Sequence, residues 1–186
     1  MARVVLIAGL AESLVNFRGP LIEALLAAGH QVAALGPEAQ PATLAWLGAR
    51  GVPYRPVPLA RAGLSPTADL ATWRAMRAEL AVLKPDAVIA YTIKPVVYGM
   101  LAARAAGVAH RHAMITGLGY AFTDGATSLK RRLVGQVARR LYALGLRQAE
   151  TVLFQNPDDL DVFRNLGLLP DSARIAYVSG ASEGGD

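Results

Sequence analysis

The chain contains no cysteine among its 186 residues. Without thiols the protein has no disulfide framework, no thiolate metal site and no cysteine nucleophile, and this composition fits a reducing compartment. Aromatic residues make up only 6% of the chain, which leaves few platforms for stacking nucleic-acid bases. No recognition-helix pattern or RNA-binding motif is present. Nucleic acid is therefore not an expected partner.

Long hydrophobic runs are also absent. Hydrophobic residues form 53% of the chain, yet no apolar run approaches the ~20 residues that a membrane-spanning helix needs. The apolar stretch at the N-terminus is short and amphipathic segments follow it at once, which disfavours a signal peptide. We expect one folded domain over residues 1–180, a linker or frayed tail at 181–186, and a cytoplasmic location.

A repeated rhythm predicts the fold class. Four times a helical, Ala/Leu-rich segment ends at a glycine, which is the residue that commonly closes a helix, and a short apolar run follows. Most of these runs are continuously apolar, as expected of strands that are buried on both faces. We predict an α/β protein with an open, mostly parallel, Rossmann-like sheet of about seven strands and helices on both faces. The expected strands are Val4–Ala8, Gln31–Leu35, Tyr54–Val57, Ala87–Tyr91, His110–Ile115, Thr151–Phe154 and Arg174–Val178.

Cofactor and metal signatures are missing from the sequence. A single glycine, Gly9, precedes Arg18 after the first strand, so the G-x-G-x-x-G fingerprint of dinucleotide binding is absent. The histidines His30, His110 and His112 have no third ligand or triad pattern around them, and we interpret them as structural, with proximity to a site left open for His112. No cofactor and no metal ion are expected.

Two loops at one edge of the sheet predict an anion site. With the usual strand order 3-2-1-4, ligands bind outside the carboxyl ends of strands one and four. The loops that follow these strands, GLAESLVNFRGPL (9–21) and TIKPVVYG (92–99), each carry a cation at a helix start, Arg18 and Lys94. Free N–H groups at a helix N-terminus and a nearby cation favour a phosphate or carboxylate. The alternative interpretation is that both cations are ordinary solvated loop residues.

A third loop, ITGLGYAFTDG (115–125), follows the fifth strand at the same edge. Thr116 can donate a hydrogen bond, Gly117 and Gly119 allow close backbone approach, and Tyr120 offers a flat face to a sugar ring. A tight turn whose aromatic residues pack on the core remains an alternative.

The positive charge of the chain is concentrated in one segment. The net charge is +5, and residues 126–149 alone carry six cations and no acid. An interfacial helix on anionic lipid and a core-facing helix with a solvated basic back both remain open. On a helical projection Leu133, Val134, Val137, Ala138, Leu141 and Leu144 share the apolar face, and Arg131, Arg132, Gln136, Arg139 and Arg140 the polar one.

Several of these segments together resemble a known family. LVNFRGPLIEALLAAGHQV, TIKPVVYGMLAARAAGV, ITGLGYAF and AETVLFQNPDDLDVF occur in this order across nearly the whole chain. The set resembles the N-terminal domain of glycosyltransferase family 4, of the bacterial polysaccharide and lipid-linked glycan type. The resemblance implies a GT-B fold, in which two Rossmann-like domains face each other across a cleft.

The resemblance also implies an activity and a set of substrate-binding residues. The domain would be the acceptor side of a retaining, metal-independent glycosyltransferase that moves a sugar from a nucleotide-sugar to a polyprenyl-diphosphate-linked or polysaccharide acceptor. Thr116 stands where some relatives have a histidine, so a histidine role in the reaction does not transfer to this chain. The implied substrate-binding residues are Asn16, Arg18, Thr92, Lys94, Thr116, Gly117, Gly119 and Tyr120.

The partners implied in this way include a C-terminal donor domain, which has no counterpart in this sequence. We therefore expect no turnover by the chain alone. Two further partners are expected. One is a second copy of this chain in a homodimer, and the other is the inner face of the cell membrane, to which residues 126–149 would attach peripherally. Two other functions stay open, a non-catalytic membrane-recruiting subunit of a split glycosyltransferase and a stand-alone binding domain for an anionic metabolite.

Overall fold

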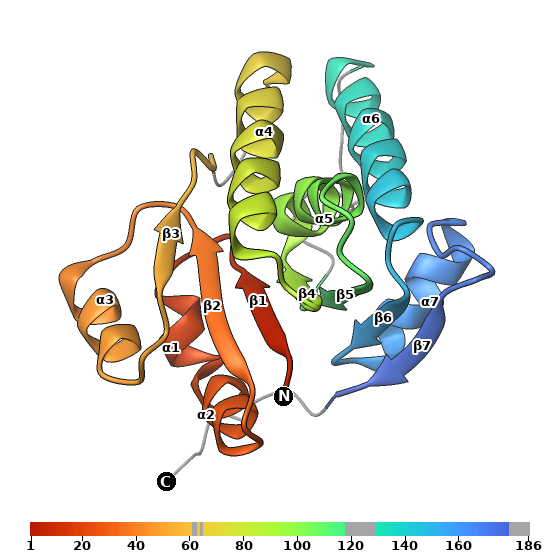
Figure 1. Ribbon diagram of the computed structural model, residues 1–186. Helices are drawn as coiled ribbons and strands as arrows, with labels where there is room; N and C mark the ends of the chain where they lie inside the picture. Colours follow the sequence, from red (N-terminus) through yellow and green to blue (C-terminus); the bar gives the residue numbers. More distant parts are fainter. Residues whose placement is uncertain (61–62, 64, 118–128, 179–186) are drawn as a thin grey trace, which may run out of the picture.

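The computed structural model describes residues 1–60, 63, 65–117 and 129–178, with side chains described outside 129–134. Its strands form one parallel sheet of seven members in the order β3-β2-β1-β4-β5-β6-β7 (Figure 1). The predicted strand number, the parallel direction and the order β3-β2-β1-β4 are confirmed. The strands are β1 (Arg3–Ile7), β2 (Gln31–Gly36), β3 (Tyr54–Pro56), β4 (Ala87–Tyr91), β5 (His110–Ile115), β6 (Thr151–Phe154) and β7 (Arg174–Tyr177).

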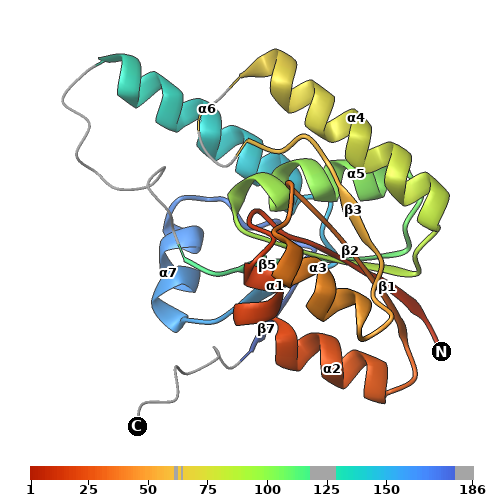
Figure 2. The same ribbon diagram turned by 90° about the vertical axis from the view of Figure 1, so that its left-hand side faces the viewer.

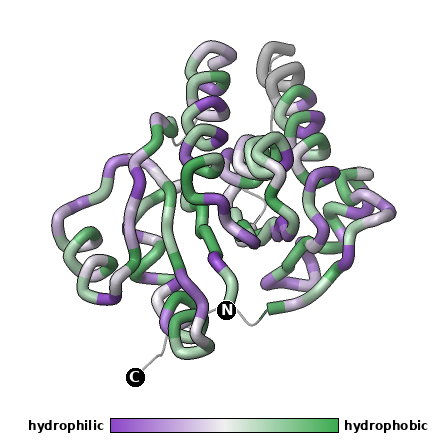
Figure 3. The backbone as a smooth tube through the Cα atoms, viewed as in Figure 1, coloured by the Kyte–Doolittle hydropathy of each residue, from purple (hydrophilic) through white to green (hydrophobic). Residues whose placement is uncertain are grey.

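The sheet is built around β1, which pairs with β2 on one side and β4 on the other. Four successive residues of β1, Val4 to Ile7, are buried, as the continuous apolar run predicted. Figure 3 shows β1 coloured mostly as hydrophobic, which agrees with the burial of all its residues but the first. Burial of alternate side chains on both faces requires helices above and below the sheet.

Helices cover the two faces in chain order, the first three on one face and the later ones on the other (Figure 2). The first face buries Leu6 and Tyr91 with Leu14 and Ile22, and the second buries Ile7 and Ala90 with Met76 and Tyr142 among others. The helices are α1 (Ser13–Asn16), α2 (Gly19–Ala27), α3 (Pro41–Gly48), α4 (Pro66–Leu83), the π-helix η1 (Pro95–Gly99), α5 (Met100–Ala105), α6 (Leu129–Leu146) and α7 (Pro157–Asn165).

The helix ends follow the predicted chemistry. The four helix-closing glycines Gly29, Gly51, Gly107 and Gly167 have φ angles of 80°, 68°, 76° and 63°, the left-handed conformation that glycine adopts without strain. At the start of α7 the side chain of Asn156 accepts a hydrogen bond of 3.0 Å from the backbone N–H of Asp158. These local signals explain why the element boundaries could be located from sequence.

The π-helix η1 lies directly after β4 and is fully buried. A glycine of α6 lets this helix approach the η1 backbone, because a Cβ atom at Gly145 would lie 2.7 Å from the Cα atom of Val97 and 2.9 Å from the carbonyl oxygen of Val96. The C-terminal part of α6 is therefore fixed against η1. The N-terminal parts of α4 and α6 extend past the carboxyl ends of β1, β2 and β3 (Figure 1).

The two outer strands of the sheet differ. At one edge β3 has only three residues and lies among Pro53, Pro56 and Pro58. At the other edge β7 has four residues and no proline, and Tyr177 is 55% exposed.

Candidate anion-binding site at the carboxyl edge

The loops after β1 and β4 meet at the carboxyl edge of the sheet. Thr92 has a φ angle of 68°, a conformation in which a β-branched residue is a genuine outlier. A Cβ atom at Gly9 would lie 2.3 Å from Oγ1 of Thr92, so only glycine fits at position 9 with the threonine in this place. Unfavourable backbone conformations of this kind gather at binding and catalytic sites, because surrounding structure must hold them. This contact marks the point where the strand order reverses.

Arg18 lies at this edge as the residue before α2, and only 7% of it is exposed. Its guanidinium carbon lies 4.9 Å from the centre of the Tyr91 ring, within the range of a cation–π interaction. Nη1 donates to the carbonyl oxygen of Phe17 at 3.2 Å, whereas the buried Nε has no hydrogen-bond partner among the described residues. Burial lowers the pKa of Arg18, with a smaller opposing contribution from Tyr91.

Tyr91 and Ser13 complete the surroundings of Arg18. Their hydroxyl groups share a hydrogen bond of 2.9 Å. Burial raises the pKa of the Tyr91 hydroxyl to about 12, so the group is protonated at neutral pH. Within the described ranges no carboxylate forms an ion pair with Arg18. The site therefore holds a nearly buried positive charge whose counter-charge does not come from the described part of the chain.

Lys94 has a different environment, although it precedes η1 at the same edge as predicted. Its Nζ atom lies 2.8 Å from Oδ1 of Asp69, and the two side chains are only 12% and 8% exposed. Oδ2 of Asp69 accepts a hydrogen bond of 3.1 Å from the backbone N–H of Ser65. Burial and the neighbouring Asp69 carboxylate both raise the pKa of Tyr98. The charge of Lys94 is thus neutralised inside the protein.

The two cations also face different sides of the sheet. Tyr91, beneath Arg18, belongs to the core with α1 and α2, whereas Asp69 comes from α4 on the other face (Figure 2). That both contact one anion stays a prediction, and the geometry favours Arg18.

The other predicted site residues differ in whether they lie at the carboxyl edge and in whether the structure describes them. Asn16 ends α1 and is exposed. Thr116 follows β5 and is exposed, and Gly117 has a φ angle of 132°, so this loop does begin at the carboxyl edge. Gly119 and Tyr120 lie outside the described residues. His112 lies in the middle of β5 and therefore away from this edge.

Sequence reasoning missed Tyr91, Ser13 and Asp69. Tyr91 was assigned to a buried strand, and nothing in the sequence indicated that the last side chain of that strand supports Arg18. The Asp69–Lys94 pair joins residues 25 positions apart on different elements, so no local spacing rule could reveal it.

The basic segment forms α6, and its packing corrects part of the helical projection. Tyr142 and Leu146 are fully or almost fully buried, whereas Val137 and Leu144, which were assigned to the apolar face, are both 42% exposed. The difference arises because Gly145 sets the line of closest contact with η1. Residues 126–128 and the side chains of 129–134 lie outside the described set. Among the described helices none is both long and apolar enough to cross a bilayer.

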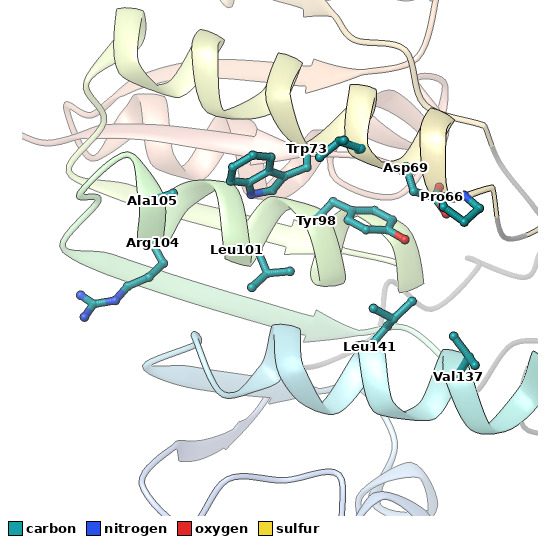
Figure 4. A pocket seen from close by; sticks show the side chains of 10 residues that line it. Pro66, Asp69, Trp73, Tyr98, Leu101, Arg104, Ala105, Val137 and Leu141 are labelled. Carbon is teal, nitrogen blue, oxygen red and sulfur yellow. The ribbon is translucent and has the colours of Figure 1, made fainter.

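An apolar groove of about 640 Å³ lies between α4, α5 and α6. Trp73 of α4, Leu101 of α5 and Leu141 of α6 line it (Figure 4). Its other lining residues are Pro66, Asp69, Leu70, Tyr98, Arg104, Ala105 and Val137. No group of three or more potential metal ligands occurs in the part of the chain that the structure covers.

Comparison with proteins of known sequence connects this architecture to a family. The chain is 31% identical over 157 residues to an N,N'-diacetylbacillosaminyl-diphospho-undecaprenol alpha-1,3-N-acetylgalactosaminyltransferase of Campylobacter jejuni. The match covers 84% of this chain and 40% of the relative, so the chain spans less than half the length of that protein.

Solved structures share the fold at low sequence identity. MurG of Acinetobacter baumannii is 18% identical with a TM-score of 0.59, and the match covers 97% of this chain and 46% of MurG. Anabaena HepE, solved with UDP and glucose, is 15% identical with a TM-score of 0.63, with 95% and 44% of the two chains covered. The fold is thus the Rossmann-like domain of GT-B glycosyltransferases.

Residues 17–181 match the family model described as a glycosyl transferase 4-like domain. The matched range contains Arg18, Tyr91, Lys94 and Thr116, and it confirms the resemblance inferred from the sequence. The chain therefore belongs to the glycosyl transferase 4-like domain family of glycosyltransferases.

Proposed function

We propose that this domain is the acceptor side of a retaining glycosyltransferase that transfers a sugar from a nucleotide-sugar to a lipid-linked or polysaccharide acceptor. The carrying observation is Arg18, a nearly buried cation at the strand-order reversal without a carboxylate partner among the described residues. The name of the Campylobacter relative supports a polyprenyl-diphosphate acceptor, since that protein acts on a diphospho-undecaprenol.

The chemistry assigned to the site is electrostatic. As the bond between the sugar and the nucleotide diphosphate breaks, negative charge grows on the departing phosphate, and a fixed cation in a water-poor site stabilises this charge. Arg18 is held in advance by Tyr91, so little reorganisation is needed when an anion arrives. Thr116 and Gly117, at the end of β5, would contact the acceptor together with Asn16, Gly119 and Tyr120. Lys94 would act mainly through the position of the loop that contains Thr92.

Transfer needs a donor and an acceptor held face to face, and one sheet of this type offers one crevice at the strand-order reversal. We therefore propose that the domain works with a donor domain and that the described chain is inactive alone. The test incubates the purified chain with lipid-linked acceptors and nucleotide-activated sugars, N-acetylgalactosamine among them, with and without a donor domain from a family member.

Each result of this assay has a defined meaning. Transfer only with the added domain supports the proposal, and retention of the anomeric configuration in the product supports the retaining mechanism. Transfer by the chain alone would overturn the division of labour. No transfer together with tight binding of a free anionic metabolite would favour the stand-alone binding domain.

Peripheral contact with an anionic membrane is part of the same proposal. Helix α6 exposes Leu144 together with Arg140, which is a combination of apolar and cationic side chains suited to a membrane surface. The chain should sediment with phosphatidylglycerol vesicles at low salt and be released at high salt. Equal sedimentation with phosphatidylcholine vesicles, or none with either, would restrict α6 to a structural role.

A further inference from the structure

The groove between α4, α5 and α6 has apolar side chains that the fold leaves open. Leu70 is 44% exposed and Val137 is 42% exposed, and both line the groove. Figure 4 shows the aromatic and aliphatic side chains of the three helices converging on the same space. The concave shape and the apolar walls are the usual features of a site for a small hydrophobic ligand.

One end of the groove lies near the loop after β4, which belongs to the candidate anion site. Asp69 and Tyr98 lie at one end (Figure 4), and Lys94, which pairs with Asp69, belongs to the loop after β4. That loop also contains Thr92, which touches Gly9 at the strand-order reversal. This end of the groove therefore lies at the same edge of the sheet as the candidate anion site.

The charges along the groove do not oppose a ligand with an anionic head. Asp69 is the one acid among its described lining residues, and Lys94 neutralises it. Arg104 lines the far end, with its guanidinium turned outward (Figure 4). The guanidinium carbon of Arg77 lies 5.7 Å from the centre of the Trp73 ring and so borders the α4 wall. The walls are thus apolar and the rim carries positive charge.

We infer that this groove binds the hydrocarbon chain of a polyprenyl diphosphate. The inference rests on the proposed function in that the diphosphate head would belong to the acceptor. The groove holds the first part of the chain while the diphosphate lies at the carboxyl edge, so the acceptor is positioned by its tail as well as its head. A groove between helices suits a long, flexible apolar chain better than a flat surface would, because the groove contacts the chain on several sides.

The two tryptophans of the chain allow a direct measurement. Trp73 lies in the groove, whereas Trp46 belongs to α3 on the opposite face, where Arg50 stacks on it at 3.7 Å. In a Trp46→Phe background, Trp73 reports on the groove alone. The probe is farnesyl diphosphate, a water-soluble polyprenyl diphosphate, and inorganic diphosphate serves as the head without a tail. We expect farnesyl diphosphate, and not inorganic diphosphate, to shift Trp73 emission to shorter wavelength.

A pair of matched double variants tests the location. Leu70→Gln with Val137→Gln makes the groove polar without adding charge, and farnesyl diphosphate affinity should fall about tenfold. The control is Leu44→Gln with Val82→Gln, because these side chains are 44% and 70% exposed and do not line the groove. The affinity of this control variant for farnesyl diphosphate should stay within about twofold of that of the Trp46→Phe protein.

Three results would overturn the inference: no emission shift with farnesyl diphosphate, an equal loss of affinity in both double variants, or a shift with phosphatidylglycerol vesicles but none with the soluble probe. The last result would identify a membrane leaflet as the occupant. The proposed function fails independently. If Trp73 responds as expected while the chain with a donor domain transfers no sugar to any lipid-linked acceptor, the groove assignment stands and the transferase assignment is lost.

Discussion

Arg18 and Lys94 look equivalent in the sequence and differ in the structure. Each is a cation at the start of a helix that follows one of the two central strands. Lys94 is neutralised by Asp69 at 2.8 Å, whereas Arg18 rests on the Tyr91 ring and has no carboxylate partner among the described residues. A cation that the protein neutralises itself holds the fold together. A nearly buried cation without such a partner is suited to a ligand.

The largest expected effect is on stability, when the ion pair between Lys94 and Asp69 is broken. In Lys94→Ala the Asp69 carboxylate stays buried without its partner, and removal of one member of a buried pair costs about 3 kcal/mol of unfolding free energy. Urea denaturation measures this change. The control is Arg164→Ala in the exposed pair with Asp161, whose side chains are 60% and 72% exposed. It should cost less than about 0.5 kcal/mol. Similar costs for the two variants would contradict the structural role of Lys94.

A smaller loss is expected where the two loops touch. Gly9→Ala places a methyl group within 2.3 Å of Oγ1 of Thr92 and should cost about 2 kcal/mol of unfolding free energy. Adding Thr92→Gly removes the clash and relieves the positive φ angle, so the double variant should regain most of the loss. Gly48→Ala, where nothing lies within 4 Å of the added atom, should be neutral or stabilising. Failure of Thr92→Gly to rescue Gly9→Ala would show that the contact does not determine the cost.

Arg18→Met should separate stability from binding. It removes a charge whose burial is unfavourable and also a cation–π contact, so the unfolding free energy should change by less than about 1 kcal/mol. Affinity for inorganic diphosphate should fall by about ten- to hundredfold, since a hydrogen bond to a charged group is worth about 1.5 to 3 kcal/mol. Isothermal titration calorimetry at low salt measures the affinity.

Arg50→Met is the matched control for Arg18→Met. Arg50 also stacks on an aromatic ring, that of Trp46, and is paired with Glu23 at 2.8 Å on the surface. Diphosphate affinity should be unchanged in this variant. An equal loss in both would mean that net charge, and not the site around Arg18, attracts the anion.

The smallest effect concerns His112, a half-buried basic side chain that lies near the carboxylate of Glu150. Burial lowers its pKa from the usual 6.5, although Glu150 opposes the shift. Between the lowered folded pKa and 6.5 the unfolded chain binds more protons than the folded one, so stability falls as pH decreases through this window. The urea midpoint should therefore decrease slightly from pH 7 to pH 5, and less in His112→Gln. An equal decrease in both proteins would assign the effect to other groups.

The fold could be predicted because its signals are local. Apolar runs, glycine stops and the Asn156 cap specify strands and helix ends within a few residues, and the order 3-2-1-4 is the usual one of doubly wound sheets. The order β3-β2-β1-β4 then located the carboxyl edge that carries the loops with Arg18, Lys94 and Thr116.

The site could be predicted only as a neighbourhood, because its properties depend on contacts between distant elements. The partner of Lys94 comes from α4, and the ring beneath Arg18 is the last residue of β4. The groove was missed since its walls come from helices that are about 65 residues apart in the chain, Leu70 on α4 and Val137 on α6. The sequence shows each helix as amphipathic but does not show which helices face each other.

The unequal edges of the sheet bear on how the protein behaves at high concentration. An outer strand with free backbone N–H and C=O groups is a template for strands of other molecules, and proline, which lacks the N–H, interrupts that template. The short β3 is interrupted in this way, whereas β7 offers an uninterrupted row beside the exposed Tyr177. Intermolecular strand pairing, and the aggregation that follows from it, should therefore begin at β7, and a proline placed there would improve solubility.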